Sequence, residues 1–480
     1  MRNICITIIF LLFFAFSTGH IWADDLDDLE ELSDEPTTEE VVNPSDDLDG
    51  MDATEDDLDA ADTIDESDEE TTEPTFSVGG YIKLLGYWNQ EKYSDLLWAM
   101  YKNPLYTSRP TSQELSGYNN TGTRLQLKIE GFLGEKARLF SAFNINYNTS
   151  YSLHDTTTKP SDKTSQNAEI RMIESFVEIY DNSRIWKIGP QLVTWSYIEG
   201  MEVPTDRVNA RDQSYKSTEY EDGKLPATGI LMTQNIGDSQ FEIMMIPTAK
   251  TNISQEFLDY IYPGPEQSID NKPNEAKWAT RFNSTIGKLD YAISYVEGID
   301  PNADLNTMNG KAYHRIKSPG LDLQYNLGSW LAKLSWVQTL TEDEDGDSLT
   351  IKNSWSKYVI GGEFSVSGST INLYAGQHLI DDFKTDALSQ STNFLLGQIR
   401  KRTDFISGHV NANFLTGDAL NLVLMAANYW DEEGETVQSI VMATFKYKIA
   451  NGLDVLVSPS YMDMMENEFT DLKTEIKYSF

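Results

Sequence analysis

The segment Thr194–Pro226 combines charged residues of both signs with tryptophan and proline. Its acids are Glu199, Glu202, Asp206, Asp212, Glu219, Glu221 and Asp222, and its bases are Arg207, Arg211, Lys216 and Lys224. Charges of both signs remain solvated inside an aqueous channel, and clusters of acids or bases set the ion preference of a pore. We interpret the segment as a loop that forms the narrow part of a pore. The alternative is an external loop with a solvated run of charge.

Catalytic chemistry finds less support in the residues. The histidines outside the N-terminal segment are His154, His314, His378 and His409. By alternation, His378 and His409 share a polar strand face with asparagines, which is more typical of a polar lining than of a general base. No serine elbow or histidine-rich metal spacing is present. A Ser/His/Asn lipid hydrolase stays open as an alternative, but no catalytic residue, cofactor or metal ligand is indicated.

The N-terminus predicts a cleaved signal peptide over residues 1–23. Arg2 supplies the positive charge, Ile4–Phe16 is apolar, and the small residue Ala23 ends a plausible cleavage site. The apolar run is too short for a spanning helix. The single cysteine, Cys5, lies in this segment, so the mature chain has no disulfide and no thiolate metal site.

Residues 24–74 differ in composition from the rest of the chain. They contain 25 acids among 51 residues and no lysine or arginine. Such charge with few apolar residues predicts a disordered segment, which we place in the periplasm. Its spacing does not match an EF-hand calcium loop, and nothing in the chain indicates a nucleic-acid partner.

Residues 75–480 show strands of about 10 residues whose side chains alternate between apolar and polar. Leu125, Leu127 and Ile129, for example, alternate with Arg124, Gln126 and Lys128. A regular polar face favours a wet lumen inside a membrane barrel over a sandwich with two apolar inner faces. By this alternation we expect five bases to face the lumen: Arg124, Lys128, Arg138, Lys187 and Arg281.

The connections alternate between short turns and long loops. Eight short turns are indicated, at Gly134-Glu135, Asp181-Asn182, Gly237-Asp238, Gly287-Lys288, Gly328-Ser329, Gly368-Ser369, Gly417-Asp418 and Asn451-Gly452. Nine mostly longer polar segments separate them. Seventeen connections predict an all-β, antiparallel transmembrane barrel of about 18 strands, with 16 as the alternative, and place both chain ends on one side.

The last strand, Leu472–Phe480, carries apolar residues on one face and ends in an aromatic residue. It resembles the C-terminal strand of bacterial outer-membrane barrels. The resemblance implies recognition of Phe480 by the barrel-assembly machinery, outer-membrane lipid as the surroundings, and localisation in the outer membrane of a bacterial cell.

Within this segment, Thr194–Leu225 is the third long loop. The architecture resembles that of porins, in which the third loop folds into the lumen. The local sequence is similar to a poorly characterised group of Gram-negative outer-membrane barrels, on the residues Gly189-Pro190-Gln191, Trp195-Ser196, Glu199-Gly200, Pro204-x-Asp206 and Asn209-Ala210-Arg211-Asp212. It departs from that group where Pro190, Ser196 and Ala210 replace Arg, Gly and Pro.

We therefore expect a porin-like channel for passive or substrate-selective diffusion of small solutes, and not an enzyme. Six loop residues are assigned to the constriction: Glu199, Glu202, Asp206, Arg207, Arg211 and Asp212. The acids of the loop are expected to face the bases of the wall and create a transverse field. Porin families imply a possible homotrimer. A structural or adhesive barrel, or the barrel-embedded hydrolase, is the alternative.

Overall fold

The fold is described from a computed structural model. It describes residues 75–89, 117–151, 164–200, 203–212, 223–252, 276–305, 310–366, 368–386, 389, 393, 396–414, 419–464 and 467–480. All of these belong to the second of two compact units, Glu70–Phe480. The predicted signal peptide and acidic segment lie outside the described residues. Among the residues described, no helix is long and apolar enough to cross a membrane.

Eighteen strands form one sheet. They are β1 (Thr75–Asn89), β2 (Gly117–Phe132), β3 (Ala137–Tyr151), β4 (Thr164–Asp181), β5 (Arg184–Gln191), β8 (Ala227–Ile236), β9 (Ser239–Ile246), β10 (Lys277–Ile286), β11 (Leu289–Ile299), β14 (Arg315–Asn326), β15 (Trp330–Thr339), β16 (Trp355–Val366), β17 (Ser369–Ile380), β18 (Arg402–Phe414), β19 (Leu420–Asp431), β20 (Thr436–Ala450), β21 (Leu453–Met464) and β22 (Asn467–Ser479). Two small hairpins lie outside the sheet, β6 (Ala210–Arg211) with β7 (Lys224–Leu225), and β12 (Asp304–Leu305) with β13 (Lys311–Ala312).

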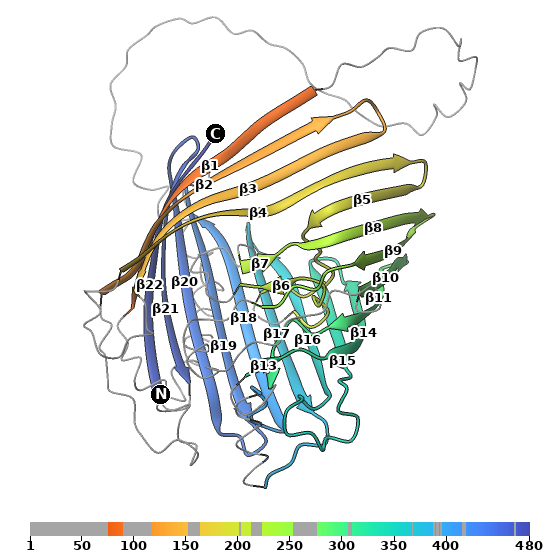
Figure 1. Ribbon diagram of the computed structural model, residues 1–480. Coiled ribbons are helices and arrows are strands. Elements are labelled where there is room, and N and C mark those ends of the chain that lie inside the picture. The colour runs from red at the N-terminus through yellow and green to blue at the C-terminus, as the bar shows by residue number, and fades with distance from the viewer. Residues whose placement is uncertain are drawn as a thin grey trace, which may run out of the picture. The chain divides into compact units, whose positions relative to one another are not determined.

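Each strand of the large sheet pairs antiparallel with its neighbours in chain order, and β1 pairs with β22 (Figure 1). The sheet is therefore a closed barrel without a free edge, which satisfies the backbone of every strand internally. The prediction of an 18-stranded antiparallel barrel is confirmed. We name five long connections: L3 (192–226), L4 (247–276), L5 (300–314), L6 (340–354) and L7 (381–401).

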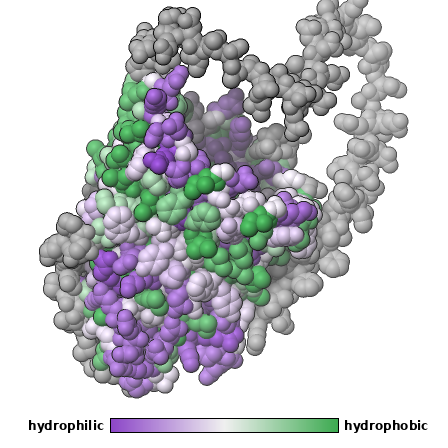
Figure 2. Space-filling view, turned by 90° about the vertical axis from the view of Figure 1, so that its right-hand side faces the viewer, coloured by the Kyte–Doolittle hydropathy of each residue, from purple (hydrophilic) through white to green (hydrophobic). Residues whose placement is uncertain are grey.

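Apolar side chains lie on the outer face of the barrel and polar side chains on the inner face. Apolar residues such as Val78 and Ile170 are 68% and 75% exposed on the outer face. Polar residues of the inner face, such as Lys83 and Asp322, are 0% exposed. Figure 2 shows part of the outer surface, where hydrophobic residues gather across the middle and hydrophilic ones toward the lower end. A strand with period-two alternation can present an apolar face to lipid and a polar face to the lumen, so the pattern and the burial agree.

Tight turns separate the strands at one end of the barrel. Gly237 and Gly287, for example, have φ values of 57° and 63°, a region in which a side chain is strained. Each forms a two-residue connection between long neighbouring strands, β8–β9 and β10–β11. Turn chemistry thus fixes where a strand ends and sets the pairing register of the hairpin.

The last residue takes part in closing the barrel. The N–H of Phe480 donates to the carbonyl of Gly80 at 3.0 Å, and the N–H of Gly80 donates back to Phe480 at 3.1 Å. The phenyl ring lies on the exposed outer face. Residue 480 therefore contributes both backbone closure and apolar outer surface.

Deletion of Phe480 is expected to lower the yield of folded, heat-modifiable barrel, because two closing hydrogen bonds and one lipid-facing ring are lost together. Electrophoretic mobility of unheated samples measures the yield, both in cells and after refolding into detergent. Phe414→Ala, which removes another exposed ring and leaves the closure intact, is the matched control. A deletion that folds as well as this control would contradict the prediction. A defect confined to cells would point to the assembly machinery.

Candidate functional site

L3 lies inside the barrel and crosses it. Near its start, Val193 and Trp195 pack with Val208 in an apolar cluster whose wall members are Ala227, Leu231, Met244, Ile246, Ala279 and Val296, on β8 to β11. Further along, Ile198 is 2% exposed and packs against Val359, Tyr374 and Phe405 of β16, β17 and β18. In Figure 1, β6 and β7 lie within the ring of strands. The loop therefore contacts two groups of wall strands, which are separated in the ring by β14 and β15.

Asn209 joins the two limbs of L3. Its side-chain oxygen accepts the N–H of Val193 at 2.8 Å. Its amide nitrogen donates to the carbonyls of Gln191 at 3.3 Å and Leu225 at 2.9 Å. Asn209 is 6% exposed, so it pairs backbone groups that water does not reach. Ala210, the next residue, begins the β6–β7 hairpin. The side chain of Asn209 thus fixes this hairpin to the end of β5.

Gly189, which precedes L3, is required by space and by conformation. Its φ is 134°, and a Cβ there would lie 2.1 Å from the carbonyl oxygen of Ser175 on β4. Two residues later, Gln191 is 0% exposed and donates to backbone carbonyls on β5 and β8. The motif Gly189-Pro190-Gln191 therefore secures the root of the loop.

Two of the predicted constriction acids are neutralised by nearby bases. Asp206 Oδ2 lies 2.9 Å from Lys224 Nζ and 3.3 Å from Arg211 Nη2, all within L3. Asp212 Oδ2 lies 2.6 Å from Arg171 Nη1 on β4. The side chains of Asp206 and Lys224 are each 2% exposed, so this pair holds the loop together more than it faces a solute.

Arg207 points from L3 toward the far wall. Its guanidinium lies 4.9 Å from the ring centre of Trp355 at the start of β16, and its Nη2 is 3.9 Å from Asp300 in L5. Lys277 of β10 donates through Nζ to the carbonyls of Arg207 and Val208, at 2.8 and 3.0 Å. These contacts fix the returning limb of L3 to two strands and to L5.

Glu199 is the exposed carboxylate of the described part of L3. Its backbone lies beside the hydroxyl of Tyr374 on β17, and its charge acts on His409 of β18. Among the described residues, no ion pair of Glu199 is found. The sixth constriction candidate, Glu202, lies outside the described residues.

The predicted wall bases share the inner face but not one location. Arg138 pairs with Glu130 at 2.6 Å and Glu178 at 2.9 Å, and Lys187 lies 3.7 Å from Glu178. Arg124 is 0% exposed and donates to Asn146 at 2.9 Å. Lys128, two residues after Gln126 on β2, has an exposed side chain. The guanidinium of Arg281 lies 5.3 Å from the ring centre of Tyr197.

This arrangement differs from the expected field of loop acids against wall bases. Arg138 and Lys187 have wall acids as partners, and Arg281 contacts L3 through an aromatic ring. Three residues outside the predicted set hold the loop instead, namely Arg171, Lys277 and Asp322. Only the folded barrel shows that these three strand residues meet L3.

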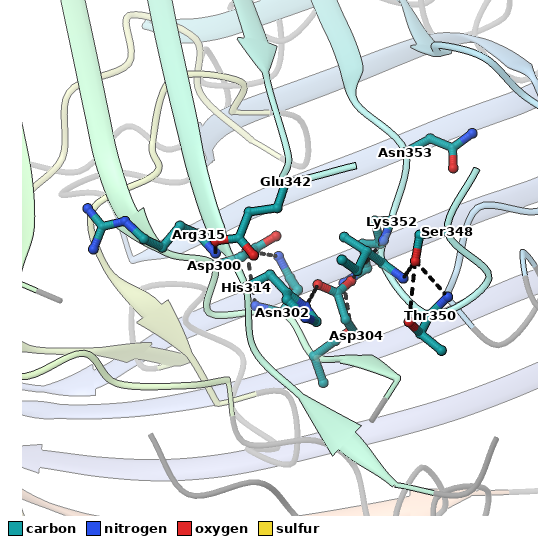
Figure 3. A network of polar contacts seen from close by, with 12 residues as sticks. Asp300, Asn302, Asp304, His314, Arg315, Glu342, Ser348, Thr350, Lys352 and Asn353 are labelled. Atoms are coloured by element: carbon teal, nitrogen blue, oxygen red, sulfur yellow. Dashed lines mark hydrogen bonds and ion pairs between the residues drawn. The ribbon is translucent and has the colours of Figure 1, made fainter. Parts of the chain in front are cut away.

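A network of polar contacts joins the neighbouring long connections (Figure 3). His314 Nδ1 lies 2.9 Å from Asp304 Oδ2, and Asp304 Oδ1 accepts the N–H of Lys352 in L6 at 3.2 Å. The N–H of Asp300 donates to the carbonyl of His314 at 2.9 Å. Asp300 is the residue that faces Arg207 of L3. The contacts thus run from L6 through L5 to L3.

The hydrogen bond to Asp304 raises the pKa of His314, and the charges of Asp304 and Glu342 add to it against burial and Lys352. A raised pKa in the folded state stabilises L5 fully below the unfolded value of about 6.5, and this stabilisation is lost as pH rises through the higher folded value. We therefore expect the amide of Leu305, which donates to Thr350 at 2.9 Å, to lose protection from hydrogen exchange above about pH 6.5.

Exchange measured by mass spectrometry, corrected for the intrinsic pH dependence, tests this. His314→Gln should have a flat protection profile over the same range, and His409→Gln should retain the wild-type profile. Protection that rises with pH in the wild type, or an unchanged profile in His314→Gln, would contradict the role given to His314.

Comparisons with known proteins support the fold. No family model and no curated protein matches the chain. Among solved structures, OccAB4 of Acinetobacter baumannii and the outer membrane protein opdK of Pseudomonas aeruginosa are both similar. Each has a TM-score of 0.50 at 9% identity, covering 84% of this chain and 98% of the other. At this identity the likeness concerns architecture: the chain has the same fold as these outer-membrane proteins.

Proposed function

We propose that the chain is a channel for diffusion of small polar solutes across a bacterial outer membrane, with L3 as its narrow part. The observation that carries the proposal is the position of L3, which is packed against β8–β11 on one side and β16–β18 on the other. A barrel of this size encloses an aqueous channel unless something fills it. A loop fixed across the lumen reduces the cross-section without requiring side chains to fill the barrel from end to end.

Within this proposal the constriction residues have different roles. Asp206, Arg211 and Asp212 stabilise L3 through ion pairs, and Arg207 fixes it to β16 and L5. Glu199 supplies the charge that a solute meets. The neighbouring structure opdK, which is named as an outer membrane protein, supports placement in the outer membrane. With that placement we propose a periplasmic N-terminal segment, assembly through Phe480 and, as in porin families, a possible homotrimer.

Planar-bilayer recording of the purified barrel tests the function. Discrete conductance steps that candidate solutes reduce by competing for the pore are expected. A folded barrel that inserts without conductance would favour a structural or adhesive role. Ester or lipid hydrolysis that persists in His409→Gln and His378→Gln would be contamination, whereas loss of hydrolysis in either variant would support the hydrolase.

A further inference from the structure

We infer that Gly320 and Asp322 of β14 form a seat that fixes the position of L3, and thereby determine the size limit of the channel. The claim about the size limit rests on the proposed function. The claim about the position of L3 does not, because that position is measurable without transport. The seat is defined by two inner-face residues of one strand and by the tip of L3 at Thr205.

Gly320 makes room for the loop. A Cβ at this position would lie 2.9 Å from Cγ2 of Thr205 and 2.6 Å from Oγ of Ser294 on the neighbouring strand β11. Real Cβ atoms do not approach other atoms so closely, so any side chain here displaces one of its neighbours. The Ser294 hydroxyl can turn away by rotation of its side chain, whereas the Thr205 methyl moves away only if the loop moves or if Thr205 rotates and gives up its hydrogen bond to Asp322.

Asp322, two residues further on the same face, binds the loop. The hydroxyl of Thr205 donates to Asp322 Oδ2 at 2.8 Å, and Asp322 is 0% exposed. The backbone of Tyr197 lies beside the same carboxylate, and the charge of Arg281 acts on it. Because Tyr197 belongs to the outgoing limb of L3 and Thr205 to the returning one, a single buried carboxylate binds one limb and lies against the other.

The loop presents Thr205 to this seat on a rigid turn. Pro204 limits the backbone before it, and the N–H of Arg207 donates to the carbonyl of Thr205 at 2.9 Å. Asp206, the next residue, is held by Lys224. Because Tyr197 lies against the same seat, a displacement there is expected to reach its neighbour Ile198, which packs on β16–β18. Gly320 and Asp322 are therefore positioning residues that act through L3.

A compensating pair of methyl groups tests the seat. Gly320→Ala adds a methyl where the Thr205 methyl lies, so it should push L3 into the lumen, lower the conductance roughly two-fold and reject the largest neutral solutes that the wild type admits. Thr205→Ser keeps the hydroxyl for Asp322 but removes the methyl. Combined with Gly320→Ala, it should restore conductance and the size limit. Asp322→Ala should loosen the loop and raise the size limit.

The matched control is Gly408→Ala, a glycine of β18 whose added Cβ would meet Cδ2 of Leu373 at 3.2 Å and the carbonyl oxygen of Asn372 at 3.9 Å, an ordinary contact. It should conduct like the wild type. Heat-modifiable migration shows which variants are folded. A folded Gly320→Ala barrel with wild-type conductance and size limit would overturn the inference, as would a double variant that remains as restricted as Gly320→Ala.

A second measurement does not depend on transport. Ile198→Cys and Val359→Cys, introduced together in the cluster where L3 packs on β16–β18, should form a disulfide in the wild-type background. Gly320→Ala should reduce the disulfide yield, and Thr205→Ser should restore it. An equal yield in all backgrounds would overturn the seat, even in a barrel that does not conduct. A barrel in which the yields follow this pattern but no solute passes would support the seat and contradict the proposed function.

Discussion

Replacing Asn209 with alanine is expected to release L3 from its fixed course while leaving the barrel assembled. The side chain pairs three backbone groups, the N–H of Val193 and the carbonyls of Gln191 and Leu225. A buried backbone group left without a partner costs about 1–3 kcal/mol, so the loss at this one residue exceeds that of most single substitutions. The ladder pairs of β5 with β4 and β8 do not use this side chain.

Two results should follow in Asn209→Ala. The loop should become open to proteases that leave the wild type intact, and the single-channel conductance should rise and become noisy. Asn209→Asp keeps the acceptor for Val193 but loses both donors, so we expect an intermediate effect. Asn413→Ala removes an exposed amide on β18, far from L3, and should behave as the wild type. A protease-resistant Asn209→Ala barrel with wild-type conductance would contradict this account of the loop.

The sequence predicts those features of this protein that depend on residues close together in the chain. Strand alternation and turns are local, so Gly237 and Gly287 marked their hairpins correctly and the count of 18 strands was confirmed. The sequence around Asn209 resembles that of other outer-membrane barrels, but only the structure shows which hydrogen bonds the Asn209 side chain makes. They join residues 16 and 18 positions away, across a loop whose path has no periodic pattern.

Contacts of L3 with the wall were beyond reach of the sequence. Thr205 and Asp322 are 117 positions apart, and no local pattern says which of 18 inner faces the tip of a loop will meet. The choice of Arg138 and Lys187 as partners of loop acids shows the limit. Both face Glu178 as direct cross-strand neighbours, Arg138 from β3 and Lys187 from β5. A wall acid one strand away is a nearer partner than an acid on a loop.

Neutralising Glu199 is expected to give the largest change in ion selectivity. The other described acids of L3 have bases within an ion-pair distance, whereas Glu199 is exposed beside Tyr374 and His409. In water the interaction energy between a unit charge and an ion 4 Å away is about 1 kcal/mol. This energy corresponds to roughly a five-fold change in permeability ratio. Wild-type channels should therefore prefer cations, and Glu199→Gln should shift the reversal potential toward anions.

The single substitution is a cleaner test than neutralising several loop acids together. Asp206→Asn would leave Lys224, with a side chain 2% exposed, beside a neutral partner. Breaking a buried pair in this way costs about 3–5 kcal/mol, so such a variant would alter the course of L3 as well as its charge. Glu199→Gln keeps the size of the side chain and leaves the ion pairs of Asp206 and Asp212 intact.

The measurement is the reversal potential across a bilayer with a salt gradient, at low and high ionic strength. The difference between Glu199→Gln and the wild type should shrink at high salt, because the screening length falls from about 10 Å at 0.1 M to about 3 Å at 1 M. Glu135→Gln, in the short turn between β2 and β3, removes an exposed charge outside the lumen and should leave the potential unchanged. Equal reversal potentials for Glu199→Gln and the wild type at low salt would place Glu199 away from the ion path. The charge selectivity would then have to arise from the inner wall.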